Sequence, residues 1–209
     1  MKKIFLLLIL VCFSASSQFI KLQNTKYFVV YDTLIISPRY AKYVIDFNTY
    51  SVGYARKSIT LDTRLKRKSQ ANAFDFAKNN VYDRGHLAPV IDFEYNIALL
   101  KEVNIYTNIA PQHKNLNRGA WRNLEKYIHD RYLLEQKNII VWTGIIPGYR
   151  LLGKLKVPLF FWKMIEIDGV FYAWKFPNTQ LLNQNFSFYE TDPLALQQLI
   201  QNYGFENFY

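Results

Sequence analysis

The segment from Val157 to Asn178 constrains the fold most strongly, because it has the pattern of two strands joined by a tight turn. Two apolar runs flank the dipeptide Asp168–Gly169. An Asp-Gly pair between such runs is a strong β-hairpin signal. We therefore expect a mostly antiparallel sheet at the centre of the molecule.

Further strands are predicted on both sides of this hairpin, because aromatic and β-branched residues cluster in short runs. Residues 48–80 are polar with little periodicity and are expected to form a loop. Gly144 is expected to end the strand that precedes it. The expected strands are Tyr27–Tyr31, Tyr40–Phe47, Asn104–Ala110 and Asn138–Gly144.

Two helices are predicted between and after the strands. The first covers about Arg118 to Leu134, and its apolar residues recur at helical spacing. The second begins at Thr191 or Asp192 as the cap, with Pro193 in the first turn, and Gly204 ends it. Strands, a long helix, more strands and a terminal helix indicate a mixed α+β fold with a sheet flanked by helices. The apolar stripe of the first helix is Trp121, Leu124, Ile128 and Tyr132.

Composition favours one globular domain. Hydrophobic residues make up 50% of the 209 residues, which excludes a disordered chain. The 16 Tyr, 16 Phe and 4 Trp are expected mainly in the core. No repeat, low-complexity tract or linker is visible, so residues 18–209 are expected to form a single domain.

Residues 1–17 have the three-part pattern of a secretory signal peptide. Two lysines precede an apolar run from Ile4 to Phe13, and small residues follow up to Ser17. The pattern predicts cleavage near Ser17–Gln18 and a secreted or periplasmic protein; a cytosolic enzyme with an accidental leader is the alternative. No second hydrophobic segment is long enough to span a bilayer, so no stable membrane association is expected.

The only cysteine, Cys12, lies inside this leader. A lipid anchor on Cys12 is the weaker interpretation, because Val11 is bulky where such a site needs a small residue. The processed chain would contain no disulfide, so its stability must come from packing.

The chain is strongly basic, with a formal charge of +10. Loss of the leader leaves 24 basic and 16 acidic residues, a net charge of +8 by the same counting. Much of the excess lies in the run from Arg56 to Ser69. Such a run is either a solvated loop or a surface for a polyanion, since phosphates attract Lys and Arg irrespective of sequence.

The stretch VYDRGHLAPV, from Val81 to Val90, concentrates chemically active residues. His86 titrates near neutral pH and is suited to act as a general base. Arg84 offers a planar fork of donors for phosphate oxygens. Asp83 can hold either neighbour, and Gly85 permits close approach of another segment. A surface turn with a local Asp–Arg pair is the alternative for these residues.

Three residues in the next segment extend this set. Asn117 can bind Mg²⁺ through its amide carbonyl, or it can cap the predicted helix. Glu125 can accept hydrogen bonds from metal-bound water, or it can pair with Lys126 or His129 on the helix surface. Asn108 can assist the site, or it can be a turn residue at a strand end.

The motifs DRGHLAP, TNIAPQ, LNRGAW and NLEKY, in this order and at this spacing, resemble the DNA/RNA non-specific endonucleases. VWTG, VPLFFWK and FPN continue the resemblance further along the chain. It implies a ββα-metal nuclease core and hydrolysis of phosphodiester bonds in DNA or RNA.

The resemblance implies roles for matching residues. His86 would activate the attacking water, and Arg84 would steady charge on the phosphate oxygens. Asn117 would be the sole direct protein ligand of one Mg²⁺, with another divalent ion such as Mn²⁺ as a substitute. Asn108 would orient His86 or the phosphate.

Two further carboxylates also match. Glu125 would hold metal-bound water, and Asp83 would support the motif structurally. The family also uses an arginine upstream of DRGH, for which Arg64 and Arg67 are the candidates.

One position departs from the family pattern. His129 stands where members commonly carry arginine, four residues after the glutamate, and is a candidate contact for substrate. Arg131 follows two residues later but lies on another face of the predicted helix.

Two other functions remain open. The three histidines, His86, His113 and His129, form one possible zinc set, although their spacing matches no known zinc motif. A basic extracellular module that binds nucleic acid without cutting it is the second alternative. DNA or RNA is the expected partner; a homodimer is compatible with the family, and the sequence contains no sign of an inhibitor protein.

Overall fold

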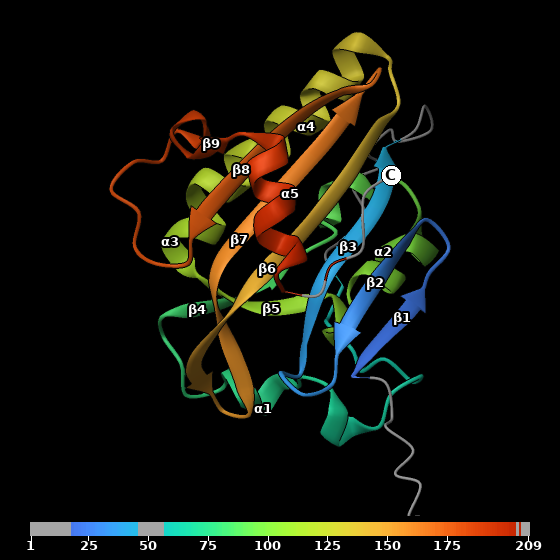
Figure 1. The fold of residues 1–209 in the computed structure, drawn as a ribbon. Helices are drawn as coiled ribbons and strands as arrows, with labels where there is room; N and C mark the ends of the chain where they lie inside the picture. Colours follow the sequence, from blue (N-terminus) through green and yellow to red (C-terminus); the bar gives the residue numbers. More distant parts are fainter. Residues whose placement is uncertain (1–17, 46–56, 204, 206–209) are drawn as a thin grey trace, which may run out of the picture.

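The computed structural model describes residues 18–45, 57–203 and 205, and within them a twisted antiparallel sheet forms the centre of the molecule (Figure 1). The predicted leader with Cys12, the start of the basic run at Arg56 and the expected helix end at Gly204 lie outside the described residues.

The main sheet has seven strands in the order β1-β2-β3-β6-β7-β8-β9, and every neighbouring pair is antiparallel. A separate pair of antiparallel strands, β4 and β5, lies against it. The strands are β1 Phe19–Gln23, β2 Tyr27–Asp32, β3 Ser37–Ile45, β4 Tyr82–His86, β5 Ile109–His113, β6 Ile139–Leu152, β7 Leu155–Ile167, β8 Val170–Pro177 and β9 Glu190–Thr191.

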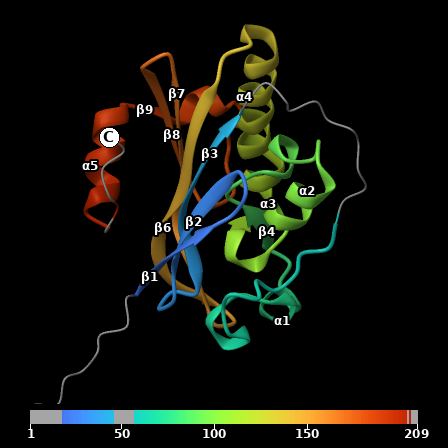
Figure 2. The ribbon, with the colours of Figure 1, turned by 90° about the vertical axis from the view of Figure 1, so that its right-hand side faces the viewer.

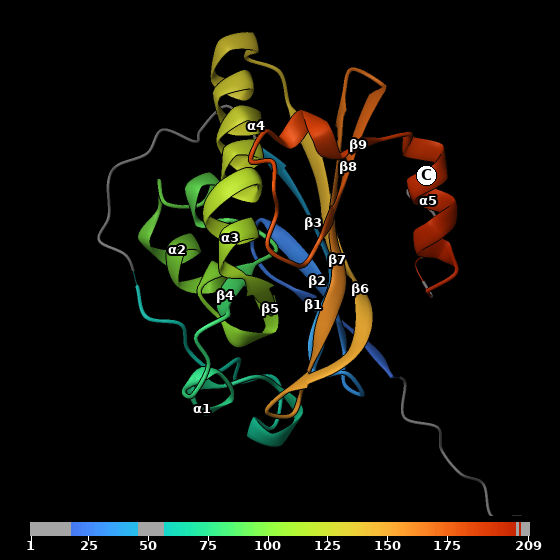
Figure 3. The same cartoon turned by 90° about the vertical axis from the view of Figure 1, so that its left-hand side faces the viewer.

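Helices cover both faces of the main sheet. Figures 2 and 3 show α5 alone on one face, with α2, α3, α4 and the β4–β5 pair on the other. This arrangement confirms the predicted α+β class. The helices are α1 Ala73–Phe76, α2 Ile97–Val103, α3 Lys114–Leu116, a π-helical segment Asn117–Trp121, α4 Arg122–Glu135 and α5 Pro193–Gln201, and 3₁₀ turns form at Arg67–Ser69, Val90–Asp92, Tyr106–Asn108 and Phe186–Tyr189.

The hairpin predicted around Asp168–Gly169 joins β7 to β8. Ile167 pairs with Val170, which leaves a two-residue loop. Asp168 and Gly169 have φ values of 50° and 79°. Positive φ at both positions defines the type I′ turn, whose twist matches that of the strands it connects.

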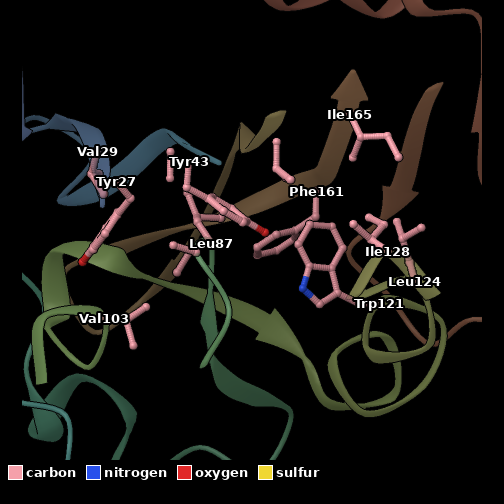
Figure 4. Close-up of a cluster of buried hydrophobic side chains, with 14 of the residues drawn as sticks. Tyr27, Val29, Tyr43, Leu87, Val103, Trp121, Leu124, Ile128, Phe161 and Ile165 are labelled. Carbon is pink, nitrogen blue, oxygen red and sulfur yellow. The ribbon is translucent and has the colours of Figure 1, made fainter. Parts of the chain in front are cut away.

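The predicted stripe of α4 packs on the sheet. Trp121, Leu124 and Ile128 are buried and face Phe161 and Ile165 of β7 (Figure 4). The ring centroids of Trp121 and Phe161 are 5.5 Å apart in an edge-to-face arrangement, which aromatic pairs prefer. Burial of this stripe fixes α4, and with it the residues that precede α4, against the sheet.

A second core lies under α5. Leu196 and Ile200 pack on Trp142, Trp162 and Met164 from the opposite face of the sheet. Asp192 is the cap of this helix, since its carboxylate accepts a hydrogen bond from the Ala195 amide at 2.8 Å.

Gly144 does not end its strand, which corrects the sequence-based prediction. β6 continues to Leu152. A Cβ at position 144 would lie 2.5 Å from both the Arg39 carbonyl oxygen and the Trp162 ring. The glycine therefore allows close packing within the sheet rather than terminating a strand.

The expected strand at Asn104–Ala110 is displaced along the chain. Tyr106–Asn108 form a 3₁₀ turn and β5 starts at Ile109. Other elements, among them β1, β4, β9 and α2, were not predicted as strands or helices, and α1 interrupts the expected loop at 48–80. No helix in the described part of the chain is long and apolar enough to cross a membrane.

Candidate active site

The candidate residues lie on one ββα unit made of β4, β5 and the helical run that follows. His86 pairs with Ile109 at one end of the strand pair, and Tyr82 pairs with His113 at the other. β5 leads directly through α3 into the π-helical segment that starts with Asn117. The unit therefore brings the DRGH residues and Asn117 together, although 31 positions or more separate them in the chain.

The DRGH residues form a strand, so the alternative of a surface turn is wrong. Asp83 pairs with Arg118 and not with the adjacent Arg84. Gly85 is required because the side chain of Gln112 crosses it: a Cβ at position 85 would lie 2.4 Å from the Gln112 Oε1. Arg84 is exposed, and no carboxylate pairs with it within the described residues.

Asp83 is the anchor between the strand and the helix. Its carboxylate accepts hydrogen bonds from Arg118 Nε and Nη2, both at 2.8 Å, and from Asn117 Nδ2 at 2.9 Å. Burial would raise the pKa of Asp83, but the hydrogen bonds from Arg118 and Asn117 outweigh it, and the pKa is lowered. Asp83 is therefore an anion throughout the neutral range.

This anchor sets the direction of the Asn117 amide. A carboxylate only accepts hydrogen bonds, so the NH₂ group of Asn117 must face Asp83 and its carbonyl oxygen must point elsewhere. Within the described residues no donor binds that oxygen. Asn117 thus presents a neutral oxygen ligand, the kind that suits a hydrated Mg²⁺.

Asn117 is not a helix N-cap, which excludes the structural alternative for this residue. N-cap residues have extended dihedral angles, whereas Asn117 has helical values of φ −57° and ψ −43° and follows Leu116, which is helical too. Gly119 interrupts the helical run with φ −113° and ψ −113°. This kink separates the turn that carries Asn117 from α4.

The imidazole of His86 is oriented by Asn104, which caps the C-terminus of α2. Asn104 donates through Nδ2 to the Leu100 carbonyl at 2.8 Å, so its Oδ1 faces the His86 Nε2 at 3.1 Å. An acceptor at that position requires the neutral ring to carry its proton on Nε2. Nδ1 is then the nitrogen that can take up a proton.

Asn117 is tied to the strand that carries His86. Asn117 is hydrogen-bonded to Asp83, and Asp83 precedes His86 by three residues in the strand. At about 3.3 Å per residue, this separation along the strand is roughly 10 Å.

Asn108 is fully buried and is hydrogen-bonded to the backbone that follows His86. Its Oδ1 accepts from the Ala88 amide at 3.0 Å, and its Nδ2 donates to the carbonyls of Ala88 and Val103 at 2.9 and 3.0 Å. These contacts tie the loop after β4 to the end of α2. The contact with the His86 ring comes from Asn104, which the sequence reasoning missed although it lies in the same short segment.

Glu125 is mostly but not fully buried and pairs with Lys163 of β7. Lys163 is fully buried, and its Nζ lies 3.4 Å from the Glu125 Oε1 and 4.5 Å from the Trp121 ring centroid. Burial raises the pKa of Glu125 to about 7, although Lys163 acts in the opposite direction. The predicted surface pairing is wrong, because Lys126 binds Asp130 instead. Lys163 was missed because a lone lysine in an apolar strand carries no local signal.

His129 is buried, which corrects its assignment as a contact for substrate. Its Nδ1 lies 3.0 Å from the Asp92 carboxylate. The hydrogen bond to Asp92 raises the pKa of His129 despite burial. The pair links α4 to the 3₁₀ turn at Val90–Asp92 and leaves little imidazole surface for a phosphate. Arg131 does not replace it, because Arg131 binds Glu135.

Arg64 is also held by protein groups. Its guanidinium binds the Asp62 carboxylate at 2.7 and 2.8 Å, the Gln23 carbonyl at 2.6 Å and the Asn24 side chain at 3.0 Å. A phosphate would have to displace these acceptors, so Arg64 does not fit the predicted substrate contact. Arg67 lies exposed in the 3₁₀ turn Arg67–Ser69 and remains available.

The zinc alternative gains no support. Within residues 18–45, 57–203 and 205, no three His, Cys, Asp or Glu side chains gather as metal ligands. His86 contacts Asn104, and His129 contacts Asp92. None of the three histidines is therefore part of a metal-ligand cluster within the described residues.

Comparisons with known proteins identify the family of the chain. A family model described as DNA/RNA non-specific endonuclease matches residues 10–205. The chain is 34% identical over 98 residues to a salivary endonuclease of Lutzomyia longipalpis, covering 41% of this chain and 24% of that protein. It is 36% identical over 96 residues to a nuclease of Serratia marcescens, covering 42% of this chain and 35% of that protein.

Similarity to mitochondrial endonuclease G is comparable. The human protein is 32% identical over 103 residues, covering 42% of this chain and 34% of that protein. The matched segments thus span about a quarter to a third of these relatives. A crystal structure of an EndoG/EndoGI complex contains a chain with a TM-score of 0.69 at 20% identity, covering 85% of this chain and 82% of that one. This likeness shows a shared fold.

Proposed function

Because the chain belongs to the DNA/RNA non-specific endonuclease family, we propose that it is a secreted, Mg²⁺-dependent endonuclease that hydrolyses phosphodiester bonds in DNA and RNA. The observation that carries this proposal is the Asp83 carboxylate, which fixes the amide of Asn117 on the strand that holds His86. This hydrolysis needs at least a general base and a cation ligand, and the ββα unit carries both.

His86 takes the proton from the attacking water through Nδ1. The Asn104 carbonyl holds the opposite ring nitrogen and stabilises the imidazolium that forms. General-base catalysis of this kind contributes roughly 10²–10⁴-fold. Arg84, which is exposed on the same strand, donates to the phosphate oxygens on which negative charge increases.

Asn117 would hold the Mg²⁺, and Glu125 would accept hydrogen bonds from water in the hydration shell of the ion. When bound, the cation stabilises negative charge on the departing oxygen. Arg118 balances the negative charge of Asp83. Asp83 therefore serves as an anchor for Asn117. Asn108 positions the segment that follows His86 through Ala88.

Secretion rests on the leader pattern of residues 1–17, and residues 18–209 would be the processed enzyme. The charge of this processed chain suits a polyanionic substrate. Determining the N-terminus of the exported protein tests this part of the proposal: a start near Gln18 agrees, and a mature chain that retains Met1 contradicts it.

Digestion of nucleic acid by residues 18–209 tests the reaction. We expect cleavage of plasmid DNA and of RNA in Mg²⁺ and none in EDTA. His86→Ala should reduce cleavage by at least about 10²-fold while circular dichroism shows an unchanged fold. Near-normal turnover of this variant would remove His86 from the role of base.

Asn117→Ala tests the cation ligand. We expect a steep increase in the Mg²⁺ concentration that gives half-maximal cleavage. Asn123→Ala is the matched control, because Asn123 is exposed on α4 and binds only the Gln184 carbonyl among the described residues. If the two variants have the same Mg²⁺ dependence as the wild type, Asn117 does not hold the cation.

A module that binds nucleic acid without cutting it is the second candidate, favoured only by the basic charge. The digestion assay separates the two, since a shifted DNA band without cleavage products supports the binding module.

A further inference from the structure

We propose that the substrate backbone reaches the active site along a basic surface that joins the 3₁₀ turn at Arg67–Ser69, the tip of the β6–β7 hairpin and β4. This inference rests on the proposed function and names the substrate contacts outside the catalytic residues. We call the surface the basic track and define it by Arg67, Lys68, Lys154, Arg150 and Arg84.

The first junction connects the basic turn to the hairpin. Lys154 donates from Nζ to the carbonyl oxygens of Arg67 and Lys68, both at 3.2 Å. Gly153 packs against α1, since a Cβ there would lie 2.9 Å from the Asp75 carboxylate. Figures 1 and 3 show the hairpin tip beside α1, below β4. A basic segment 86 positions away in the sequence is thus fastened to the hairpin.

The second junction connects the hairpin to the catalytic strand. Arg150 donates from Nη1 to the Tyr82 hydroxyl at 3.2 Å, and its guanidinium carbon lies 5.7 Å from the Tyr82 ring centroid. Alternate residues of a strand share a face, so Tyr82, Arg84 and His86 point to the same side of β4. The cations therefore continue from Arg150 through Arg84 to the proposed base.

The charges of the track are available to a ligand. Arg67, Lys68, Arg84 and Arg150 are exposed, and none of them forms an ion pair within the described residues. Two acids beside the track have other partners: Asp75, next to Gly153, accepts a hydrogen bond from the Asn72 amide, and Asp83, next to Arg84, is bound by Arg118.

A row of unpaired cations that ends at a phosphodiester-cleaving site suits a nucleic-acid backbone. Such contacts bind phosphates irrespective of base sequence and release condensed counterions, so the logarithm of affinity falls linearly with the logarithm of salt concentration. Base-specific recognition would need side chains that read base edges. The contacts that define the track lie within the protein, and they join Lys154 to two backbone carbonyls and Arg150 to Tyr82. The track therefore predicts sequence-independent binding with strong salt dependence.

The test measures binding rather than cleavage, in EDTA and in the His86→Ala background, by fluorescence anisotropy of a labelled single strand. The variant carries Arg67→Gln, Lys68→Gln and Arg150→Gln. The control carries Lys21→Gln, Lys126→Gln and Lys137→Gln, which removes the same number of positive charges outside the track. Lys126 pairs with Asp130, and Lys137 pairs with Asp168. Lys154 is retained because it binds backbone carbonyls.

We expect the slope of log affinity against log salt to decrease by about 2 in the track variant and to stay unchanged in the control, over about 50–200 mM salt. The gain in affinity from a hexanucleotide to a long strand should also shrink in the track variant. Equal slopes for the two variants overturn the track, because net charge alone would then explain the binding. Wild-type protein that fails to cleave contradicts the proposed function, while the binding slopes still decide the track.

Discussion

At the scale of single residues, the site depends on which end of each amide is fixed. Asp83 captures the NH₂ group of Asn117, and the Leu100 carbonyl captures that of Asn104. Each contact leaves a carbonyl oxygen that faces away from that partner. The Asn104 oxygen faces the His86 ring, and the Asn117 oxygen is the cation ligand in the proposed function. Replacing either partner would free the amide to rotate and present a donor instead.

Asn104→Asp tests the orientation of His86. A carboxylate beside Nε2 favours the imidazolium, so the pKa of His86 should increase and the acid limb of the kcat/KM profile should move to higher pH. Asn104→Ala should lower kcat by about 10–100-fold, as for loss of an outer positioning partner, with a smaller change in KM. A purely structural role for Asn104 predicts lower thermal stability in both variants and an unshifted pH profile.

Lys163→Met tests the buried pair. Without the opposing ammonium, burial should raise the pKa of Glu125 further above about 7. The carboxylate would then be neutral at neutral pH and would accept weaker hydrogen bonds from hydration water. We expect the Mg²⁺ requirement to increase at pH 7 and to recover partly at higher pH.

Lys175→Met is the matched control for this substitution, because Lys175 is half-buried on the adjacent β8 and lies over Phe160. It should leave the pH dependence of the Mg²⁺ requirement unchanged. If Lys163→Met behaves in the same way, Lys163 serves packing alone. A methionine of similar volume is a fair replacement, since apolar substitutes for buried ion pairs are often well tolerated.

At the scale of elements, the helical segment that carries Asn117 is kinked at Gly119. Gly119 breaks the helical geometry, and the Gln184 side chain fills the space where a Cβ would be, 1.7 Å from its Oε1. The same Oε1 accepts a hydrogen bond from the Ala120 amide at 2.9 Å. A distant loop thus completes the hydrogen bonding of this irregular turn.

Gly119→Ala should displace Gln184 and leave the Ala120 amide without its acceptor. Loss of a buried partner costs about 1–3 kcal/mol, so we expect a clearly lower melting temperature and a higher Mg²⁺ requirement. Gln184→Ala should lower the stability less in the Gly119→Ala background than in the wild type, because it also removes the clash between Gln184 and the new methyl group. Strict additivity of the two substitutions in thermal melts would show that the predicted contact does not cause the effect.

At the scale of the whole molecule, buried ionisable groups control stability against pH. Burial raises the pKa of Glu125 from 4.5 to about 7, so the unfolded chain loses this proton at lower pH than the folded protein does. Stability therefore falls as pH increases through this window. The raised pKa of His129 acts in the same direction, because the stability that its charge contributes is lost as pH rises through the folded pKa. His113 opposes both, since burial lowers its pKa.

We therefore predict that the metal-free protein melts several degrees higher at mildly acidic pH than at alkaline pH. Below that range stability should fall again, because Asp62 and Asp83 have lowered pKa values and lose their partners when protonated. Calorimetry in EDTA across the pH range measures this, and Glu125→Gln should remove much of the decrease between mildly acidic and neutral pH. A melting temperature that rises steadily with pH would contradict the assignment.

Much of the architecture followed from local pattern. The Asp-Gly turn, the apolar stripe of α4 and the Asp192 cap are properties of neighbouring residues, and each was confirmed. The strand limits at Gly144 and Ile109 were not predicted correctly, because they depend on packing against distant chain segments.

The sequence by itself determined the chemistry that is available: an imidazole, a guanidinium, an amide and a carboxylate in the order that one nuclease family shares. Only the tertiary structure decided which groups meet, with Asp83 bound to Arg118, His86 to Asn104, and Glu125 to Lys163. Two other ion pairs make His129 and Arg64 unsuitable as substrate contacts, because His129 binds Asp92 and Arg64 binds Asp62. The physical reason is that burial and ion pairing depend on distances between side chains far apart in the chain, and local periodicity does not encode them.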